Sequence, residues 1–426
     1  MRTGTAPARS TRRVAPPLEH RILTTATLCL IAFGAVMVYS ASSPQVVISG
    51  GGYGTGEFLT YLLAAGLGLI AMRLCEQFGL GWLAQERIVL FLLFGSCALL
   101  LAVLVPGIGL DINGARRWFG AGPIQFQPSE LTKLALVLYV ARYLADHPKR
   151  INRGFKQAMA PIAVVAGPAC LLIAVEPDLG TTLVVCFTIV SMLVVAGVPT
   201  GYLMRVGLAL AACLGLMLLV HPYEAGRLTS FLHPFSQIAG AGYQSAQAQY
   251  AVGSGGISGV GLGQSVAKLQ WLPEAQSDFI LAVIGEELGM LGILVVVSLY
   301  GMIAYAGLRT ARRAASRYTK LLASGLTSLI LCQGILNIFV VLGIAPLTGV
   351  PLPFLSYAPT NLIVMLVAIG LLQGIARPAA RELRLVDREQ PEPAATRHER
   401  SADPYRDRRH RGSRGTGPGR RRAAEG

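Results

Sequence analysis

The chain has 426 residues, of which 53% are hydrophobic and 14% are charged, and its formal net charge at pH 7 is +15. A soluble domain of this length would need a far more polar surface, so the composition indicates a membrane-embedded protein. Much of the positive charge lies at the chain ends and in short loops, which argues against a nucleic-acid-binding protein. The seven cysteines fall in apolar runs without a CxxC spacing, which argues against a zinc site or a disulfide framework.

Apolar segments dominate the chain from residue 21 to residue 376. A helix of roughly 20 apolar residues crosses about 30 Å of hydrocarbon. The first segment is long and lacks a convincing A-x-A cleavage site, so we interpret it as a span and not as a signal peptide. We predict an all-α polytopic membrane protein with about ten transmembrane helices, near residues 21–41, 57–76, 88–106, 129–146, 158–175, 180–197, 202–220, 279–308, 320–344 and 360–376.

Lysine and arginine in short loops predict the orientation of these spans. A cytoplasmic N-terminus places three basic clusters inside, at residues 2–13, 149–156 and 309–320. The outer loops then hold only four cationic residues, which are Arg116, Arg117, Arg227 and Lys268. We therefore expect a multi-pass protein of the cytoplasmic (inner) membrane with both termini in the cytoplasm.

The chain divides into three parts. Residues 1–20 form a basic cytoplasmic segment, and residues 21–376 form the membrane domain. Residues 377–426 hold 14 Arg and no Lys against 8 Asp or Glu, and their composition is typical of a disordered cytoplasmic tail that is solvated or touches lipid headgroups or a partner. The expected outer loops are 107–128, the long loop 221–278 between the seventh and eighth spans, and the proline-rich, re-entrant 345–359.

The segment RRWFGAGPIQFQPSELTK (116–133) holds the first candidate site. Glu130 and Lys133 are three residues apart, so they share a helix face and can form an ion pair. Pro128 suits the start of the helix and Ser129 is a candidate N-cap. Because an unpaired ammonium inside the membrane is costly, a structural Glu130–Lys133 pair is one interpretation of this spacing.

A phosphate-binding pocket is the other interpretation of the same segment. Arg116 and Arg117 lie outside the cell against the charge bias, and together with Lys133 they would suit an anionic ligand. Trp118 would then contact the ligand, or it serves only as an interfacial anchor. Gln127 is a further candidate contact in this segment.

Two other outer segments carry distinctive residues. In VEPDLGTT (175–182), Glu176 and Asp178 lie at a turn, where they are either solvated or structural acids near a site. The segment AVGSGGISGVGLG (251–263) has six glycines, but it matches neither a phosphate-loop nor a GxGxxG pattern. We interpret it as a flexible or tightly packed backbone.

Four carboxylates occur in LPEAQSDFILAVIGEELG (272–289). Asp278 precedes the apolar run of the eighth span, where a substrate in the outer leaflet could reach it. Glu286 and Glu287 would lie roughly 12–14 Å deep at 1.5 Å per residue, so we expect them to pair with other helices or to be protonated. Glu274 is expected to shape the loop before Asp278.

Taken together, these motifs resemble the SEDS family (shape, elongation, division and sporulation), of which FtsW and RodA are the best-known branches. The resemblance covers residues 21–376, and its motifs are VMVYSAS (36–42), GARRWFGAGPIQFQPSELTK (114–133), EPDLGTT (176–182), residues 243–289 and PLPFLSY (351–357). The stretch KLQWLPEAQSDFI is more similar to the division branch, FtsW, than to the elongation branch. RodA-like and SpoVE-like (sporulation) roles stay open.

The resemblance implies a peptidoglycan glycosyltransferase that polymerises lipid II at the outer face of the membrane, at the division septum for the FtsW branch. The family's catalytic aspartate corresponds to Asp278, which would act as general base on the acceptor sugar hydroxyl while undecaprenyl diphosphate leaves with inversion. Arg116, Arg117 and Lys133 are the expected cations for the diphosphate. A class B penicillin-binding protein (a transpeptidase) and other divisome proteins are the implied partners. No metal site or cofactor is predicted, and a requirement for a divalent cation stays open.

Two departures from the family pattern are visible. Gln276 and Ser277 stand where many relatives have His-Thr, and Ala358 and Pro359 replace two glycines of the usual SYGGS. A lipid II flippase, an ion-coupled transporter using Glu286 and Glu287, and a non-catalytic scaffold for a transpeptidase remain alternative functions.

Overall fold

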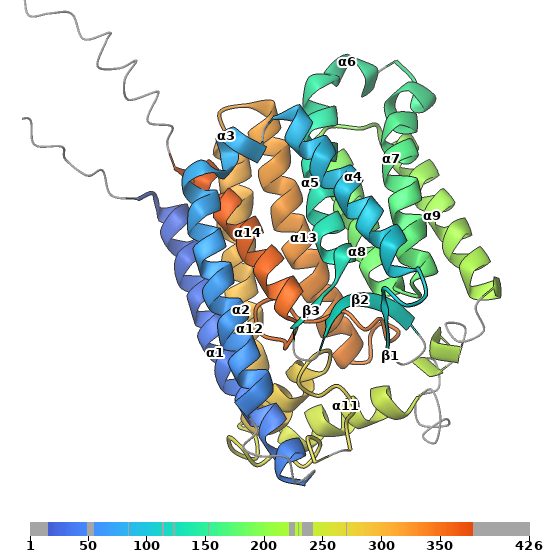
Figure 1. The fold of residues 1–426 in the computed structure, drawn as a ribbon. Coiled ribbons are helices and arrows are strands. Elements are labelled where there is room, and N and C mark those ends of the chain that lie inside the picture. The colour runs from blue at the N-terminus through green and yellow to red at the C-terminus, as the bar shows by residue number, and fades with distance from the viewer. Residues whose placement is uncertain are drawn as a thin grey trace, which may run out of the picture. The chain divides into compact units, whose positions relative to one another are not determined.

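A computed structural model of the 426-residue chain describes residues 16–48, 55–83, 85–112, 115–121, 124–151, 153–220, 226–228, 230–231, 242–269 and 271–377. Residues 1–15 of the predicted basic segment and residues 378–426 of the predicted tail lie outside this set. The same holds for most of 221–241 in the long outer loop. The fold is therefore the fold of the membrane domain (Figure 1).

Helices coincide with all of the predicted spans, which confirms a mostly helical fold. They are α1 (Leu18–Ile48), α2 (Thr55–Leu74), α4 (Glu86–Val103), α5 (Pro128–Asp146), α7 (Phe155–Val175), α8 (Leu179–Val195), α9 (Thr200–Val220), α12 (Ile280–Arg313), α13 (Arg317–Val341) and α14 (Pro359–Ala376). Shorter elements are the π-helix Cys75–Gly79 that continues α2, α3 (Leu80–Leu83), α6 (Pro148–Ile151) and α11 (Tyr243–Gly255).

Eight of the helices in the described part of the chain are long and apolar enough to cross a membrane. Of the other two, α8 is apolar but has only 17 residues. The α5 helix carries two acidic and two basic side chains, which are Glu130, Lys133, Arg142 and Asp146. The precise number of spans therefore stays a prediction, although α5 and α8 pack inside the bundle beside α13.

The centre of the bundle is built from α12, α13 and α14. Two thirds of the residues in the most apolar stretch of each of these helices are buried. The α13 helix packs against α5, α8, α12 and α14, while α1 and α2 cover α12 and α14 (Figure 1). The α9 helix lies at the periphery, and its segment Thr200–Met217 buries none of its residues. Lipid is the natural neighbour of such a helix.

The outer segment 107–128, predicted as a loop, contains a small antiparallel sheet. Its strands are β1 (Leu110–Ile112), β2 (Ala115–Ala121) and β3 (Ile124–Phe126), in the order β1-β2-β3. Asp111 pairs with Arg116 and Phe119 pairs with Phe126 across it. The strands are short and rich in glycine and proline at their ends, so the sequence alone looked like a loop.

The non-helical segment 345–358 is buried among the helices, as expected of a re-entrant segment. Its backbone carbonyls accept hydrogen bonds from side chains of three helices. The donor–acceptor pairs are Asn337 to Val350 (2.8 Å), Gln333 to Pro351 (2.9 Å), Tyr300 to Pro353 (2.5 Å) and Tyr61 to Phe354 (2.6 Å). Irregular backbone at membrane depth needs such partners, so these polar side chains hold the segment in place.

The departure at Ala358 and Pro359 fits this fold. Pro359 is the first residue of α14, a position where proline is favoured because its missing N–H has no helical partner. Ala358 has φ −149° and needs no glycine. Both replacements are therefore compatible with the start of the last helix at Pro359.

Candidate active site

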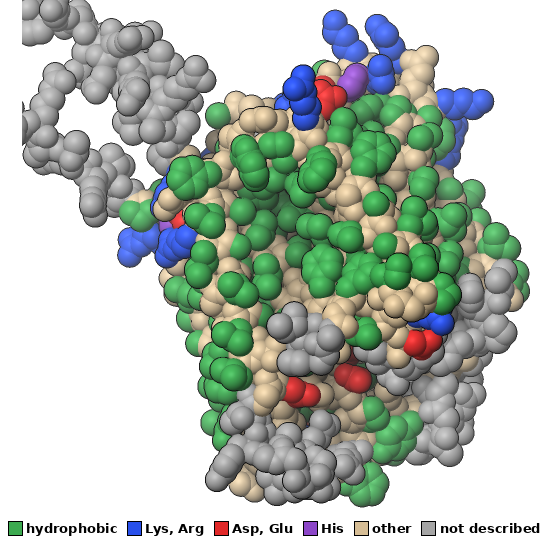
Figure 2. Space-filling model, in the orientation of Figure 1, with side chains coloured by type: hydrophobic (Ala, Val, Ile, Leu, Met, Phe, Trp, Pro, Cys, Tyr) green, Lys and Arg blue, Asp and Glu red, His purple; other side chains and the backbone are tan. Residues whose placement is uncertain are grey.

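A cavity of about 680 Å³ opens where the outer segments meet the bundle. It is lined by residues of α2, β2, α5 and α11, by the turn before α8, and by the segments 274–279 and 347–361. In Figure 2 hydrophobic side chains cover the middle of the face shown, lysine and arginine gather at its upper edge, and acidic side chains appear among the outer segments below. The outer segments thus bring widely separated motifs to one place.

Asp278 lies at the inner end of the loop before α12 and lines this cavity. Its backbone carbonyl accepts a 2.7 Å hydrogen bond from Asn337, and Gly349 lies against its carboxylate. Among the described residues, no side chain or backbone N–H donates to that carboxylate. Asp278 is therefore held by its backbone while its carboxylate is left available to a ligand.

The surroundings of Asp278 raise its pKa to about 7. Burial is the main cause, followed by the negative charges of Glu274 and Asp178, while Arg227 and Arg117 oppose the shift. An ordinary aspartate is a weak base at neutral pH, and a carboxylate with a raised pKa is a stronger one. The cavity thus contains a carboxylate suited to accept a proton near neutral pH.

The two arginines of β2, Arg116 and Arg117, have different surroundings. The Arg117 Nε atom donates to the Glu176 carbonyl at 2.7 Å, its Nη2 atom donates to the Pro177 carbonyl, and its side chain lines the cavity. Arg116 pairs with Asp111 at 3.4 Å and does not line the cavity.

Lys133 is buried and does not reach the cavity. Its Nζ atom lies 2.8 Å from Glu130 and donates to Gln333 at 2.8 Å. Glu130 accepts a further 2.7 Å bond from Asn361 and is itself at the cavity wall. The structural pair is thus the interpretation the geometry supports, and the expectation that Arg116 and Lys133 line an anion pocket is corrected.

Ser129 was expected to cap α5, and this is wrong. The helix begins one residue earlier with Pro128 at its first position, and the N-cap residue is Gln127. The buried Ser129 hydroxyl has no hydrogen-bond partner in the described part of the chain. Gln127 instead donates to Asp178 at 3.1 Å and lines the cavity, as does Trp118.

Glu176 and Asp178 are buried, so the interpretation of a solvated turn is also wrong. Asp178 lines the cavity and caps α8 by accepting a 3.0 Å bond from the Thr181 N–H. Among the residues that the structure describes, neither carboxylate oxygen of Glu176 has a hydrogen-bond partner. Burial and the charge of Asp178 raise the Glu176 pKa to about 8, against the opposing effect of Arg117, so this acid is mostly neutral at pH 7.

Glu274 lines the cavity beside Asp278, at a position where its backbone φ is +57°. It accepts a 2.9 Å bond from the Ser277 hydroxyl. Glu286 and Glu287 lie away from the cavity, as expected from their depth. Glu287 contacts Ser40 of α1 and Lys268, whereas Glu286 binds the loop 265–267 and not a second helix.

The sequence analysis missed several residues at the site, among them Arg227, Gln333 and Asn337 and also Glu57 of the cavity wall. Arg227 lines the cavity, and its isolated positive charge in an outer loop was a usable signal. Gln333 and Asn337 hold the segment that faces Asp278. Their signal is a pair of amides four residues apart on one face of an otherwise apolar helix.

A metal site is not formed by the described residues, in which no three His, Cys, Asp or Glu side chains converge as a metal would require. The acidic lining of the cavity includes Glu57, Glu130, Asp178, Glu274 and Asp278. Two arginines, Arg117 and Arg227, supply positive charge to the same wall.

Comparison with known proteins identifies the family. The Cell cycle protein family model FtsW/RodA/SpoVE matches residues 20–381. Stage V sporulation protein E of Bacillus subtilis is 38% identical over 372 residues, which is 86% of this chain and 99% of that protein. A probable peptidoglycan glycosyltransferase FtsW of Legionella pneumophila is 40% identical over 312 residues, which is 72% of this chain and 77% of the relative.

Solved structures agree with the sequence relatives. The rod shape determining protein RodA of Thermus thermophilus has a TM-score of 0.60 at 28% identity, covering 85% of this chain and 97% of that chain. A chain from a structure described as "Structural coordination of polymerization and crosslinking by a peptidoglycan synthase complex" has a TM-score of 0.67 at 29% identity, covering 83% and 96%. With its many apolar helices, the chain is an integral membrane protein, and it belongs to the FtsW/RodA/SpoVE family of cell cycle proteins.

Proposed function

We propose that this protein is a peptidoglycan glycosyltransferase that polymerises lipid II into glycan strands at the outer face of the cytoplasmic membrane. Asp278 carries the proposal, because it places a carboxylate of raised pKa, free of hydrogen bonds from the described residues, in the wall of a large cavity. Relatives named as probable peptidoglycan glycosyltransferases support the same reaction.

In the proposed reaction, Asp278 takes the proton of the acceptor sugar hydroxyl as its oxygen attacks the anomeric carbon of the donor. The bond from that carbon to the diphosphate oxygen breaks, and undecaprenyl diphosphate leaves with the electron pair. Attack from the face opposite the leaving group inverts the anomeric carbon. Arg117 and Arg227, which line the cavity, are placed to stabilise the charge that develops on the diphosphate.

The other lining residues shape the substrate site. The negative charge of Glu274 helps to raise the pKa of Asp278. Trp118 and Gln127 offer an aromatic face and an amide to the sugar or its peptide. Glu130 contributes to the wall through its pair with Lys133.

We infer a multi-pass protein with both termini in the cytoplasm, because the basic residues of α6 and of the last turn of α12 belong to one side under the charge rule. The similarity to the FtsW relatives supports a role at the division septum, with other divisome proteins as neighbours. The similarity to a chain of a peptidoglycan synthase complex supports a partner that crosslinks strands, a class B penicillin-binding transpeptidase.

Reconstitution tests the proposal. The purified protein in vesicles, with and without a class B penicillin-binding partner, is given lipid II, and glycan strands are resolved by gel electrophoresis. Wild type is expected to form polymer, and Asp278→Asn is expected to form none. Absence of polymer under every condition would overturn the proposed enzymatic activity. Polymer formed by Asp278→Asn would overturn the role of Asp278 as the general base. A flippase would instead move labelled lipid II across the vesicle with or without Asp278.

A further inference from the structure

The loop from Gly256 to Phe279, which ends beside Asp278, is seated in a break of α12. We call residues 256–279 the active-site loop. Within α12, Gly289 has φ +67° and ψ −160°, a conformation that interrupts the helical hydrogen bonds. Loop and helix backbones complete each other there, through Val260 N to Glu286 O (3.0 Å), Gly261 N to Glu287 O (3.0 Å), Met290 N to Gly256 O (3.0 Å) and Leu291 N to Ile257 O (3.3 Å).

Close approach of two backbones explains the glycines of this region. A Cβ atom added to Gly259 would lie 2.1 Å from the Glu287 carbonyl oxygen. A Cβ atom added to Gly255 would lie 1.9 Å from the Gly285 carbonyl oxygen. Side chains at these positions would push the loop off the helix, so the packed-backbone interpretation of the glycine-rich segment is supported.

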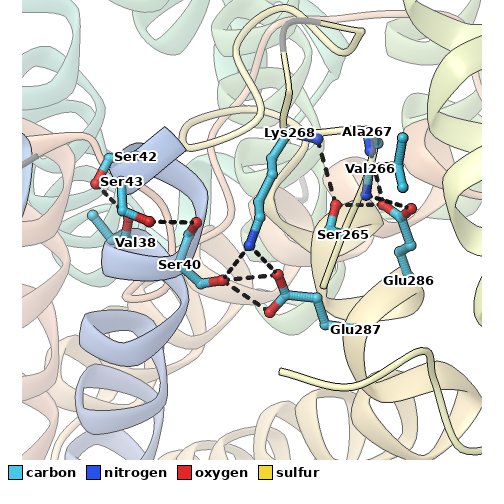
Figure 3. A network of polar contacts seen from close by, with 10 residues as sticks. All are labelled: Val38, Ser40, Ser42, Ser43, Ser265, Val266, Ala267, Lys268, Glu286 and Glu287. Carbon is cyan, nitrogen blue, oxygen red and sulfur yellow. Dashed lines mark hydrogen bonds and ion pairs between the residues drawn. The ribbon is translucent and has the colours of Figure 1, made fainter. Parts of the chain in front are cut away.

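A buried ionic cluster fastens the middle of the loop. The Lys268 Nζ atom lies 2.8 Å from Glu287 Oε1 and 3.0 Å from the Ser40 hydroxyl oxygen (Figure 3). The Ser40 hydroxyl lies 2.8 and 3.0 Å from the two Glu287 oxygens. All three side chains are buried, which joins α1, the active-site loop and α12. We call these three residues the loop clamp.

Glu286 holds the neighbouring part of the loop. Its carboxylate accepts a hydrogen bond from the Ser265 hydroxyl and bonds from the backbone N–H groups of Val266 (2.9 Å) and Ala267 (3.3 Å), as Figure 3 shows. The two deep carboxylates therefore hold residues 265–268 of the loop, while the backbone carbonyls of the same two glutamates bind Val260 and Gly261 in its glycine-rich stretch.

Between the clamp and Asp278, several of the described residues are anchored to the rest of the fold. The Leu272 N–H donates to the Ala267 carbonyl at 2.9 Å, and the side chains of Leu272 and Ala275 are fully buried. The Gln276 carbonyl accepts a 2.9 Å hydrogen bond from the backbone N–H of Tyr357. A displacement at Lys268 would therefore move the segment that carries Asp278.

A buried ion pair is a weak contributor to stability, because desolvation offsets much of the attraction, and apolar side chains often stabilise a core as well. Hydrogen-bonded ion pairs fix the direction and distance between their groups, however, and apolar contacts do not. A charged cluster at this depth is therefore suited to holding a segment of chain in one position.

We propose that Lys268 and Glu287 are positioning residues that fix the active-site loop, and with it the Asp278 carboxylate, against the cavity. Ser40 extends the same clamp to α1. The inference rests on the proposed glycosyl transfer and adds to it residues that touch neither substrate nor the reacting atoms.

The first test is the kinetics of lipid II polymerisation by the full chain with its transpeptidase partner. Lys268→Met and Glu287→Gln are expected to lower kcat about 100-fold, as displacement of a catalytic group by about 1 Å does, and to leave KM within about threefold. The charge-swapped double variant Lys268→Glu with Glu287→Lys rebuilds the pair and is expected to recover at least about tenfold of that loss. The double variant also keeps the proposal testable if a single variant, left with one unpaired buried charge, fails to fold.

Glu19→Gln is the matched control. Glu19 is a buried acid of α1 that pairs with Arg309 and Arg313 of α12, both at 2.7 Å, so it joins the same two helices at their other end. The control is expected to lower the melting temperature as the clamp variants do, while kcat stays within about twofold of wild type.

Hydrogen exchange of backbone amides supplies a readout without activity. Lys268→Met is expected to increase exchange across residues 256–279 and to leave α13 unchanged, whereas Glu19→Gln is expected to leave 256–279 unchanged. Unchanged exchange in the loop, a kcat equal to wild type, or a loss of kcat in Glu19→Gln of the same size would each overturn the positioning role. If wild type forms no polymer, the proposed function fails, and the exchange comparison still decides whether the clamp fixes the loop.

Discussion

Asp278 combines two properties that a free aspartate lacks. Its carboxylate is enclosed by the cavity wall with Glu274 and Asp178 nearby, so its charged form is disfavoured and its pKa rises to about 7. Its backbone is tied to Asn337, so the side chain does not need hydrogen bonds to stay in place.

The rate of polymerisation is expected to depend on the ionisation of Asp278. A general base must be unprotonated, so kcat/KM should rise with pH through an apparent pKa of about 7 and level off above about 8. The measurement is kcat/KM between pH 5.5 and 9 in vesicles. A profile that is flat from pH 5.5 to 8 would contradict the raised pKa.

Asp278→Asn is expected to remove activity and to stabilise the fold at high pH. The folded pKa exceeds the ordinary value of 3.8, so the folded state binds more protons and wild-type stability falls as pH rises from about 4 to about 7. The neutral amide avoids this loss. Its melting temperature in detergent should exceed that of wild type by at least about 2 °C at pH 8 and by less at pH 5. An equal difference at both pH values would count against this reasoning.

Arg117→Ala and Arg116→Ala form a neighbouring pair with opposite expectations. Arg117 lines the cavity and Arg116 pairs with Asp111 on the sheet. Removing one charge-stabilising donor costs about 100-fold in rate, so Arg117→Ala should lower kcat/KM by that order, while Arg116→Ala stays within about threefold. Equal losses of kcat/KM in the two variants would contradict the different roles assigned to Arg116 and Arg117. The assay is again lipid II polymerisation.

At the scale of elements, the active-site loop and the break in α12 depend on each other. The break leaves backbone groups of α12 without helical partners, and the loop backbone supplies them. Only residues without a Cβ atom let the two chains come this close. The glycine-rich stretch is therefore a structural complement of the helix and not a ligand loop.

Gly259→Ala is expected to destabilise the protein by at least about 1–2 kcal/mol, because φ is +80° there and the new Cβ atom would strike the Glu287 carbonyl. Gly253→Ala is the control, since it lies in α11 with open space around it and alanine favours helix by up to about 1 kcal/mol. Melting temperatures in detergent should fall for the first variant and hold or rise for the second. A shared fall would argue against the close packing described above.

At the scale of the whole molecule, the membrane domain ends where family similarity ends. The family model reaches residue 381, and Arg377 pairs with Glu76 of the π-helix at 2.5 Å. Glu76 also pairs with His20 of α1 and Arg73 of α2. The last described residue is thus tied to the first two helices.

A chain that stops after residue 381 keeps this ion pair and every residue of the cavity. We expect it to polymerise lipid II with a kcat within about twofold of the full chain and with an unchanged melting temperature. The comparison uses both proteins in the same vesicles. A large loss of rate would show that the Arg-rich segment 382–426 takes part in catalysis or in binding the partner.

Much of the fold could be read from the sequence, because a bilayer restricts the backbone to helices long enough to cross it. Hydropathy located these ten helices with their ends within three residues, except that α1 and α12 extend seven and five residues further. Motif order placed Asp278 just before α12. The three-residue strands of the sheet were missed, since a pattern of period two needs a longer run to stand out.

The sequence by itself determined which residues carry charge into the membrane, but only the tertiary structure decided what each charge does. Lys133 and Lys268 look alike in sequence, as lone lysines near apolar helices, and for Lys133 the sequence left an anionic ligand open. Packing assigns them to Glu130 and Glu287 instead. The physical reason is that a buried charge takes the nearest opposite charge in space, and those partners are set by how helices and loops pack.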